Sequence, residues 1–174
     1  MTVYILDNIS PREVSVTPTP ANENTEIVSF DKDKRTLTGV ASYEIVDDYN
    51  TILAVKSMDL TRFNTVYYDH RAWGMPDAQI PIGQITHAQK TTIKGKNAVF
   101  VEIQLDKSHP TNRLSDIVLD KVDQGSLRGF SIGFPYSEKL EYTAVEDEEA
   151  ENYDSYNDKP AKDEEETTDP NQII

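Results

Sequence analysis

The stretch LRGFSIGF, residues 127–134, predicts a β-strand whose two faces differ in character. Strand side chains alternate between faces, so the large apolar residues are expected on one side and Gly129, Ser131 and Gly133 on the other. The apolar side would enter a core. Two interpretations of the glycines stay open: they leave room for a substrate backbone beside the Ser131 hydroxyl, or they mark a bulge or close packing.

Taken literally, residues 129–133 match the G-x-S-x-G pattern of the nucleophile elbow in α/β-hydrolases. That elbow needs a helix directly after the serine and a histidine later in the chain. Here Pro135 follows closely, and His70, His87 and His109 all precede Ser131. The sequence therefore disfavours a lipase or esterase of that fold.

Other segments of the chain also predict strands, so the expected fold class is a mainly β (α+β) domain. Apolar and β-branched runs predict further strands at Glu13–Thr17, Ile27–Phe30, Thr36–Glu44, Asn64–Tyr68, Ile80–His87 and Ala98–Leu105. The polar turns at 31–34 and 94–97 predict two hairpins. We expect these strands to form a small closed β-barrel with accessory helices.

One segment has helical periodicity. The helix is expected to start after Pro110 and Thr111 and to stop before Gly125. Its apolar face is expected to hold Leu114, Ile117, Val118 and Val122.

Charge divides the chain into a body and an acidic tail. The 174 residues carry a net charge of −14, and residues 141–174 hold thirteen acidic residues against two lysines. We therefore expect one folded domain at 1–140 and a disordered tail at 141–174, because such a composition buries too little surface to offset ordering. The body has no basic stripe, so nucleic acid is not an expected partner.

The composition also limits the chemistry. The chain has no cysteine, which excludes disulfides, thiolate catalysis and cysteine zinc sites. Its three scattered histidines make a poor metal site, so no metal or cofactor is expected. The opening MTVYILDNIS lacks the features of a signal peptide, and no run approaches the ~20 apolar residues that cross a membrane.

Serine chemistry needs a base, because a free hydroxyl is a weak nucleophile. His70 ends the predicted strand 64–68 and precedes a loop at 71–79. Active-site histidines often lie at such a position, but so do solvated ones. His87 and His109 lie in polar segments and are expected at the surface.

Two segments together resemble the tailed-phage prohead proteases, which are capsid maturation serine proteases related to herpesvirus assemblins. These segments are YYDHRAWGMPDAQIPIGQI, residues 67–85, and LSDIVLDKVDQGSLRGFSIGF, residues 114–134. In that family a histidine precedes the nucleophilic serine, which matches His70 and Ser131. SFDKDKRTLTGVASYEIVDD, residues 29–48, resembles the family's first hairpin, so the resemblance covers roughly 27–134 and implies a herpesvirus-protease-like barrel.

The chain departs from the family after its serine strand. The family usually continues to a strand of the type E-V-S-L-V … P-A-N, but here the acidic segment follows Phe134. REVSVTPTPANENTEI, residues 12–27, instead opens the chain, so residues 1–26 resemble the family's last strand moved to the front by circular permutation. A chance match is the alternative.

This placement implies a third catalytic residue. Transferred from the family, the acidic partner of His70 is Glu13, which would fix the imidazole tautomer. Strand alternation is expected to turn Val14 and Val16 inward and Glu13 and Ser15 outward. A solvated strand glutamate is the alternative to this role.

Asp69 and Asp106 are alternatives to Glu13 as the carboxylate that pairs with His70.

The oxyanion of the proposed reaction also needs hydrogen-bond donors. Backbone N–H groups near Ser131, helped by Arg12 or Arg128, would stabilise it.

The resemblance implies a serine endopeptidase that processes phage capsid and scaffold proteins, and itself, during prohead maturation. Its expected partners are the major capsid protein, the scaffold and further copies of itself, with no membrane and no nucleic acid. Its expected location is the host cytoplasm, inside the assembling prohead. A non-enzymatic capsid assembly protein that keeps the fold is the alternative. The acidic tail is either a solubilising end or a segment that docks on a basic inner capsid surface.

Overall fold

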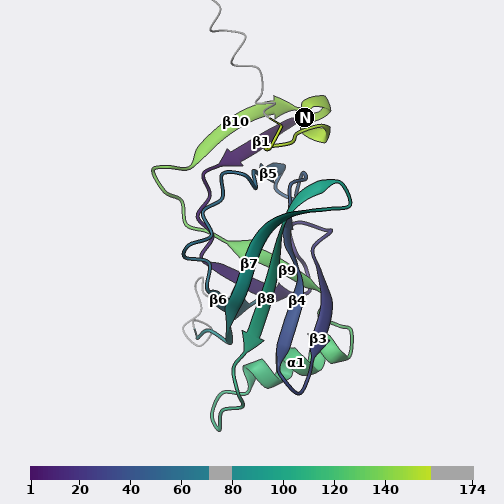
Figure 1. The fold of residues 1–174 in the computed structure, drawn as a ribbon, viewed down its shortest axis with the longest axis vertical. Coiled ribbons are helices and arrows are strands. Elements are labelled where there is room, and N and C mark those ends of the chain that lie inside the picture. The colour runs from purple at the N-terminus through teal and green to yellow at the C-terminus, as the bar shows by residue number, and fades with distance from the viewer. Residues whose placement is uncertain (71–79, 158–174) are drawn as a thin grey trace, which may run out of the picture.

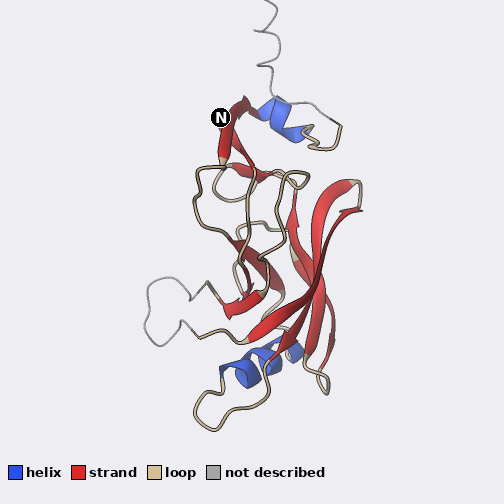
Figure 2. Ribbon diagram, turned by 60° about the vertical axis from the view of Figure 1, so that its left-hand side comes forward, coloured by secondary structure: helices blue, strands red, loops and turns tan. Residues whose placement is uncertain are grey.

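The computed structural model describes residues 1–70 and 80–157, which form two β-sheets and two short helices (Figure 1). One sheet has the strand order β10-β1-β5, and the other has the order β3-β4-β8-β7-β6-β2-β9. The elements are β1 (Thr2–Asp7), β2 (Glu13–Thr17), β3 (Glu26–Asp31), β4 (Thr36–Tyr43), β5 (Thr51–Leu53), β6 (Thr65–Tyr68), β7 (Gly83–Ile93), β8 (Lys96–Leu105), α1 (Leu114–Asp123), β9 (Gly129–Gly133), β10 (Glu141–Glu146) and α2 (Asp147–Glu151). The two helices lie at opposite ends of the molecule (Figure 2). The predicted mainly β class is confirmed.

The strands expected from sequence form, and both hairpins are confirmed. β3 and β4 pair antiparallel, as do β7 and β8. The second turn passes through Gly95 at a φ of +77°, a conformation that glycine adopts without steric cost. β9 is a strand and the residues directly after it are not helical, so the nucleophile-elbow geometry is absent from this described stretch.

The predicted helix is confirmed as α1, but its buried face is rotated from the expected one. Ser115, Val118, Leu119 and Val122 are buried, whereas Ile117 is 52% exposed. At about 100° per residue the buried positions span about 100° of the helix and so share a face. Ile117 lies about 160° round the helix from Ser115 and Leu119, which turns it to solvent.

The large sheet is not the closed barrel that the sequence predicted. It curls until its edge strands β3 and β9 approach each other, and Ile27 N–H donates to Arg128 O at 2.8 Å. The Thr25 hydroxyl adds a hydrogen bond to Phe130 O at 2.6 Å. Within the described residues no ladder joins these two edges, so the sheet stays open. β3 instead pairs along its length with β4, from Glu26↔Val40 to Asp31↔Thr36.

The boundary predicted for the acidic tail is wrong. β10 begins at Glu141 and pairs antiparallel with β1 from Thr2↔Glu146 to Asp7↔Glu141. This small sheet has its own core, formed by Val3, Ile5, Ile52, Ala54, Val145 and Ala150. The sequence predicted disorder because the segment is rich in acidic residues, but β10 and α2 still bury apolar side chains, among them Val145 and Ala150. The part of the predicted tail at 158–174 lies outside the described residues, as does the predicted loop at 71–79.

A buried carboxylate ties the C-terminal part of the fold to the large sheet. Glu44 is 2% exposed and accepts hydrogen bonds from Val55 N–H at 2.7 Å and Asn97 Nδ2 at 3.0 Å. It also accepts both the N–H and the hydroxyl of Ser155, at 2.7 and 2.6 Å. These donors satisfy the charge that burial would otherwise make costly.

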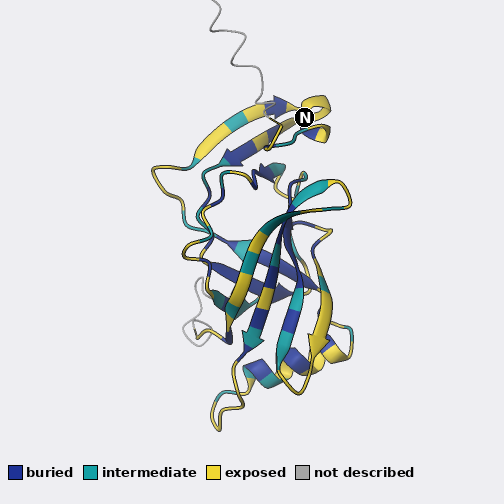
Figure 3. Cartoon of the chain, in the orientation of Figure 1, coloured by how far each residue is buried: buried dark blue, intermediate teal, exposed yellow. Residues whose placement is uncertain are grey.

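The main core lies between the curled faces of the large sheet and α1 (Figure 3). Val14, Val16 and Phe130 are fully buried in it, as strand alternation predicted. The core therefore fixes β2 and β9, the two strands that carry the candidate site. None of the helices in the described part of the chain has the length and apolar character that a membrane crossing requires.

Candidate active site

Strand pairing brings together three segments that are far apart in the sequence. β2 lies between β6 and β9, parallel to the first and antiparallel to the second. Ser15 is the register partner of Ser131, and Glu13 is the partner of Gly133. Because β6 runs parallel to β2, its C-terminal end delivers His70 beside the same strand. The site is thus assembled on one central strand.

The imidazole of His70 contacts the carboxylate of Glu13. His70 Nδ1 lies 2.8 Å from Glu13 Oε1, and the Glu13 side chain is 4% exposed against 33% for His70. An ionised carboxylate can only accept a hydrogen bond, so Nδ1 is the donor in this contact. The neutral imidazole then carries no proton on Nε2, which leaves that atom able to accept one.

Ser131 opens onto the same cleft as His70. The cleft has a volume of about 300 Å³, and Ser131 is 9% exposed within β9. Apolar side chains dominate one part of the lining, among them Leu6 and Leu53 of the small sheet. The exposed Tyr136 stands at its rim. The Ser131 hydroxyl and the His70 imidazole therefore line one concave surface, and the buried Glu13 carboxylate contacts the imidazole.

The glycines on either side of Ser131 are sites of close packing. A Cβ at Gly133 would overlap Oε1 of Glu13 and lie 2.7 Å from its Cδ. A Cβ at Gly129 would lie 2.8 Å from Cγ of Pro20. Of the two interpretations left open by the sequence, close packing is the one observed. The positions on either side of Ser131 in β9 are occupied by the Pro20 and Glu13 side chains, and Ser131 itself lines the cleft.

Glu13 and Ser15 lie on the face of β2 opposite Val14 and Val16, as expected, but this face is covered, so the alternative of a solvated Glu13 is wrong. Every residue of β2 is buried, and Ser15 is fully so. β2 is an internal strand, and residues 69–70 fold back over its polar face: His70 N–H donates to Ser15 Oγ at 2.9 Å. The role of Ser15 was not predicted. Its only sequence signal is its position two residues after Glu13, on the same strand face.

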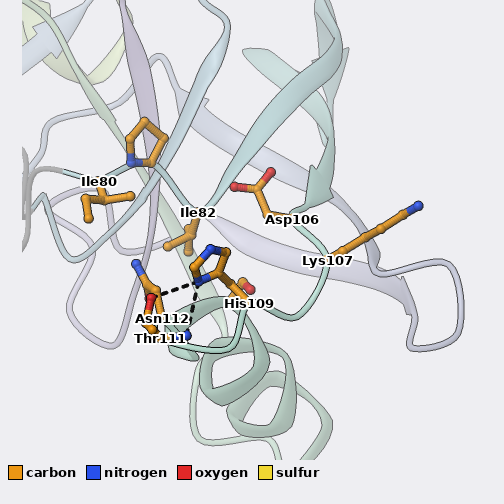
Figure 4. Close-up of a pocket in the computed structure, with 9 residues that line it drawn as sticks. Ile80, Ile82, Asp106, Lys107, His109, Thr111 and Asn112 are labelled. Atoms are coloured by element: carbon orange, nitrogen blue, oxygen red, sulfur yellow. Dashed lines mark hydrogen bonds between the residues drawn. The ribbon is translucent and has the colours of Figure 1, made fainter.

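The rival carboxylates lie in other environments. Asp69 accepts a hydrogen bond from the Thr17 hydroxyl at 2.8 Å. Asp106 lies in a separate pocket with Ile82 and His109 (Figure 4), where His109 Nδ1 accepts the Thr111 N–H at 3.1 Å. The carboxylate in contact with the His70 ring is that of Glu13.

The two arginines considered for the oxyanion are placed elsewhere. Arg12 and Arg128 are exposed, and neither is among the described residues that line the cleft. Arg128 Nε donates to Gly125 O at 2.5 Å. The structure therefore does not bring either guanidinium to Ser131. His87 and His109 are both exposed, as predicted.

No protein-family model, curated protein or solved structure matches this chain. The chemistry of the site must therefore be argued from its own geometry. Among residues 1–70 and 80–157, no group of three or more His, Asp or Glu side chains is arranged to hold a metal ion. The cleft offers a hydroxyl and a proton acceptor, and the acceptor is held by the buried carboxylate of Glu13; these three groups together are suited to acyl transfer.

Proposed function

We propose that this chain is a serine endopeptidase that processes capsid and scaffold proteins, and itself, during prohead maturation of a tailed bacteriophage. Ser131 is the nucleophile, His70 is the general base and Glu13 orients His70. The substrate class comes from the resemblance of residues 67–85 and 114–134 to prohead proteases. The proposed catalytic roles of these residues are supported by their arrangement at the cleft.

One observation carries the proposal: the contact of 2.8 Å between Glu13 and His70 at the cleft that Ser131 lines. A carboxylate buried to 4% exposure needs a partner, and the imidazole supplies one. The pair is assembled from residues 57 positions apart in sequence. An orienting acid, a base and a hydroxyl are the three parts of a serine hydrolase triad.

In the proposed acylation step, Ser131 Oγ bonds to the carbonyl carbon of the scissile peptide. The hydroxyl proton moves to Nε2 of His70, and Glu13 stabilises the imidazolium that forms. Backbone N–H groups beside Ser131 act on the oxyanion. The carbon–nitrogen bond then breaks, and the leaving amine takes the proton from His70.

Deacylation repeats the cycle with water. The water gives a proton to Nε2 while its oxygen attacks the acyl carbon, and the proton returns to Oγ as the acid product leaves. No bound cofactor takes part in this scheme. Ser131 is free for a second turnover.

The direct test is intact-mass analysis of the chain co-expressed with the phage's capsid and scaffold proteins. The wild type is compared with Ser131→Ala and with Ser126→Ala, which removes an exposed serine hydroxyl outside the cleft. We expect shortened capsid and scaffold products with the wild type and with Ser126→Ala. With Ser131→Ala we expect no shortened products, so that all proteins keep their full-length masses.

The opposite result would replace this proposal with the assembly-protein alternative. That result is identical full-length masses for all three chains, with capsids that still assemble. The cleft would then be a feature of packing and would have no role in catalysis.

A further inference from the structure

Three alternate residues of β2, Glu13, Ser15 and Thr17, form hydrogen bonds with residues 69 and 70. Glu13 Oε1 contacts His70 Nδ1 at 2.8 Å, and Ser15 Oγ accepts the His70 N–H at 2.9 Å. Thr17 Oγ1 donates to Asp69 Oδ1 at 2.8 Å. Alternate residues of a strand share a face, so one face of β2 hydrogen-bonds to both the imidazole ring and the backbone N–H of His70, the proposed base.

Ser15 closes a ring of hydrogen bonds. Its hydroxyl donates to Glu13 Oε2 at 2.9 Å and at the same time accepts the backbone N–H of His70. Glu13 Oε1 accepts from His70 Nδ1, which completes the ring. Both oxygens of the buried carboxylate are thereby engaged. A single hydroxyl fixes the orientation of the carboxylate and the backbone of the histidine together.

The backbone that Ser15 holds is in a sparsely populated conformation. Asp69 has a φ of +50° and His70 a φ of +52°, both in the left-handed region. A non-glycine residue in this region is held there by its surroundings, because the conformation is strained for a side chain with a Cβ. The bonds that fix it come from β2: Asp69 N–H to Val16 O at 3.0 Å, and His70 N–H to Ser15 Oγ.

Ser15 also lies next to the proposed nucleophile without access to substrate. Its register partner across the β2–β9 ladder is Ser131, and cross-strand partners have Cβ atoms about 4.5–5.5 Å apart. Ser15 is 0% exposed, so it cannot touch a substrate in the cleft. Any effect of its hydroxyl on the reaction must therefore pass through neighbouring protein groups, and its hydrogen bonds are to Glu13 and His70.

We infer that Ser15 is a positioning residue of the active site, one that sets the tautomer and direction of the His70 imidazole. This inference rests on the proposed function of Ser131 and His70. It adds to the triad a fourth residue, which holds Glu13 and His70 in one fixed arrangement. Loss of the hydroxyl would leave Glu13 Oε2 buried without its donor and would remove the hydrogen bond from the His70 backbone to β2, while the bonds of Asp69 to β2 stay.

The test uses the full chain and two readouts. The first is the rate at which a fluorophosphonate probe labels Ser131, in which Oγ displaces fluoride from phosphorus and His70 accepts the hydroxyl proton. The second is nitrogen NMR of histidine-labelled protein, which reports the tautomer of each ring. The chain has only three histidines, so His70 is assigned by comparison with His87→Gln and His109→Gln.

Three substitutions at Ser15 separate its hydroxyl from its volume. Ser15→Ala removes the hydroxyl, Ser15→Thr keeps it, and Ser15→Cys keeps the side-chain size with a weak donor and acceptor. Ser115→Ala is the matched control, because Ser115 is another buried serine whose hydroxyl accepts a hydrogen bond, from Arg35 at 3.1 Å, and it lies outside the cleft.

We expect Ser15→Ala to slow labelling by about tenfold to a hundredfold, because small misplacement of a catalytic group has effects of that order. Its His70 signal should lose the Nδ1–H tautomer. Ser15→Thr should recover much of the rate, and Ser15→Cys should behave like Ser15→Ala and serves in its place if the alanine variant does not fold. Ser115→Ala should change neither readout, whatever its melting temperature.

Two results separate this inference from the proposed function. A wild type that labels at Ser131, together with a Ser15→Ala variant of equal rate and unchanged His70 tautomer, would overturn the positioning role alone. A wild type that does not label, but whose His70 tautomer depends on Ser15, would overturn the proposed function and support the hydrogen-bonded ring.

Discussion

The tight fit between Gly133 and Glu13 leads to the sharpest prediction. Replacing Gly133 by alanine would place a methyl group on the Glu13 carboxylate, 2.7 Å from its Cδ and 3.0 Å from its Cγ. Ordinary van der Waals contact begins near 3.4 Å, so Cδ must move by about 0.7 Å, the difference between these two distances. Glu13 is 3% exposed, which leaves it little space to move elsewhere.

Such a shift acts directly on the proposed base. The contact between Glu13 and His70 is 2.8 Å long, and about 0.7 Å more would take it past the usual range of hydrogen bonds. A misplacement near 1 Å can cost about a hundredfold in rate. We therefore expect Gly133→Ala to label with fluorophosphonate about a hundredfold more slowly than the wild type. The overpacking itself should cost about 1–3 kcal/mol of stability.

Gly129→Ala is a matched control in the same strand and on the same face. Its Cβ would lie 2.8 and 3.1 Å from Pro20 carbon atoms, so it also overpacks β9, but it leaves Glu13 in place. Thermal unfolding followed by circular dichroism should show similar losses of stability for both variants, with activity lost mainly in Gly133→Ala. Equal labelling rates in the two variants would contradict the inference that a glycine is needed at position 133 to leave room for the Glu13 side chain.

Three further predictions follow from other residues. Glu13→Gln should lower the labelling rate by about 10³–10⁴-fold, because an amide N–H facing Nδ1 of His70 selects the tautomer that cannot accept the serine proton; a rate near the wild type would contradict it. Glu44→Gln should reduce the free energy of unfolding in urea by about 1.5–3 kcal/mol, because one of its two accepting oxygens becomes a donor facing other donors. A hydrogen bond from Ser108 lowers the pKa of Asp116, so its contribution to stability is present at neutral pH and lost as the pH falls below about 4. Urea unfolding of Asp116→Asn should therefore differ from the wild type at pH 7 and approach it at pH 3, and a constant difference would contradict this origin.

Strand alternation predicted the buried side of β2 and part of that of β9. Val14, Val16 and Phe130 are fully buried, whereas Ile132 and Phe134 are only partly buried and line the cleft. The same rule placed Glu13 and Ser15 together on the opposite face of β2 but could not say how far they are buried. Alternation says that they share a face, but whether that face meets solvent depends on residues 69–70 folding over it.

The small sheet escaped prediction for a compositional reason. β10 has only two acidic residues out of six, but the 34 residues 141–174 hold thirteen, and averaging over all of them conceals this one short strand. Its partner β1 reads as an apolar run that gives no sign of where it pairs. Pairing between the two ends of a chain is a long-range contact, which local sequence patterns do not encode.

The candidate site was predicted in its residue types but not in its supporting contacts. The Glu13 and His70 contact joins two segments whose meeting depends on the parallel register of β2 and β6. The ring closed by Ser15 requires that same register and two left-handed residues at 69 and 70. The glycines beside Ser131 were visible in the sequence, but only the packing of Pro20 and Glu13 explains them.

The most direct measurement of the central claim is the site and rate of fluorophosphonate labelling, mapped by peptide mass spectrometry. We expect one label, on Ser131 in the wild type, and almost none in His70→Ala. Labelling on another serine, or equal labelling of Ser131 with and without His70, would contradict it. Either contradictory result would mean that the cleft does not activate Ser131.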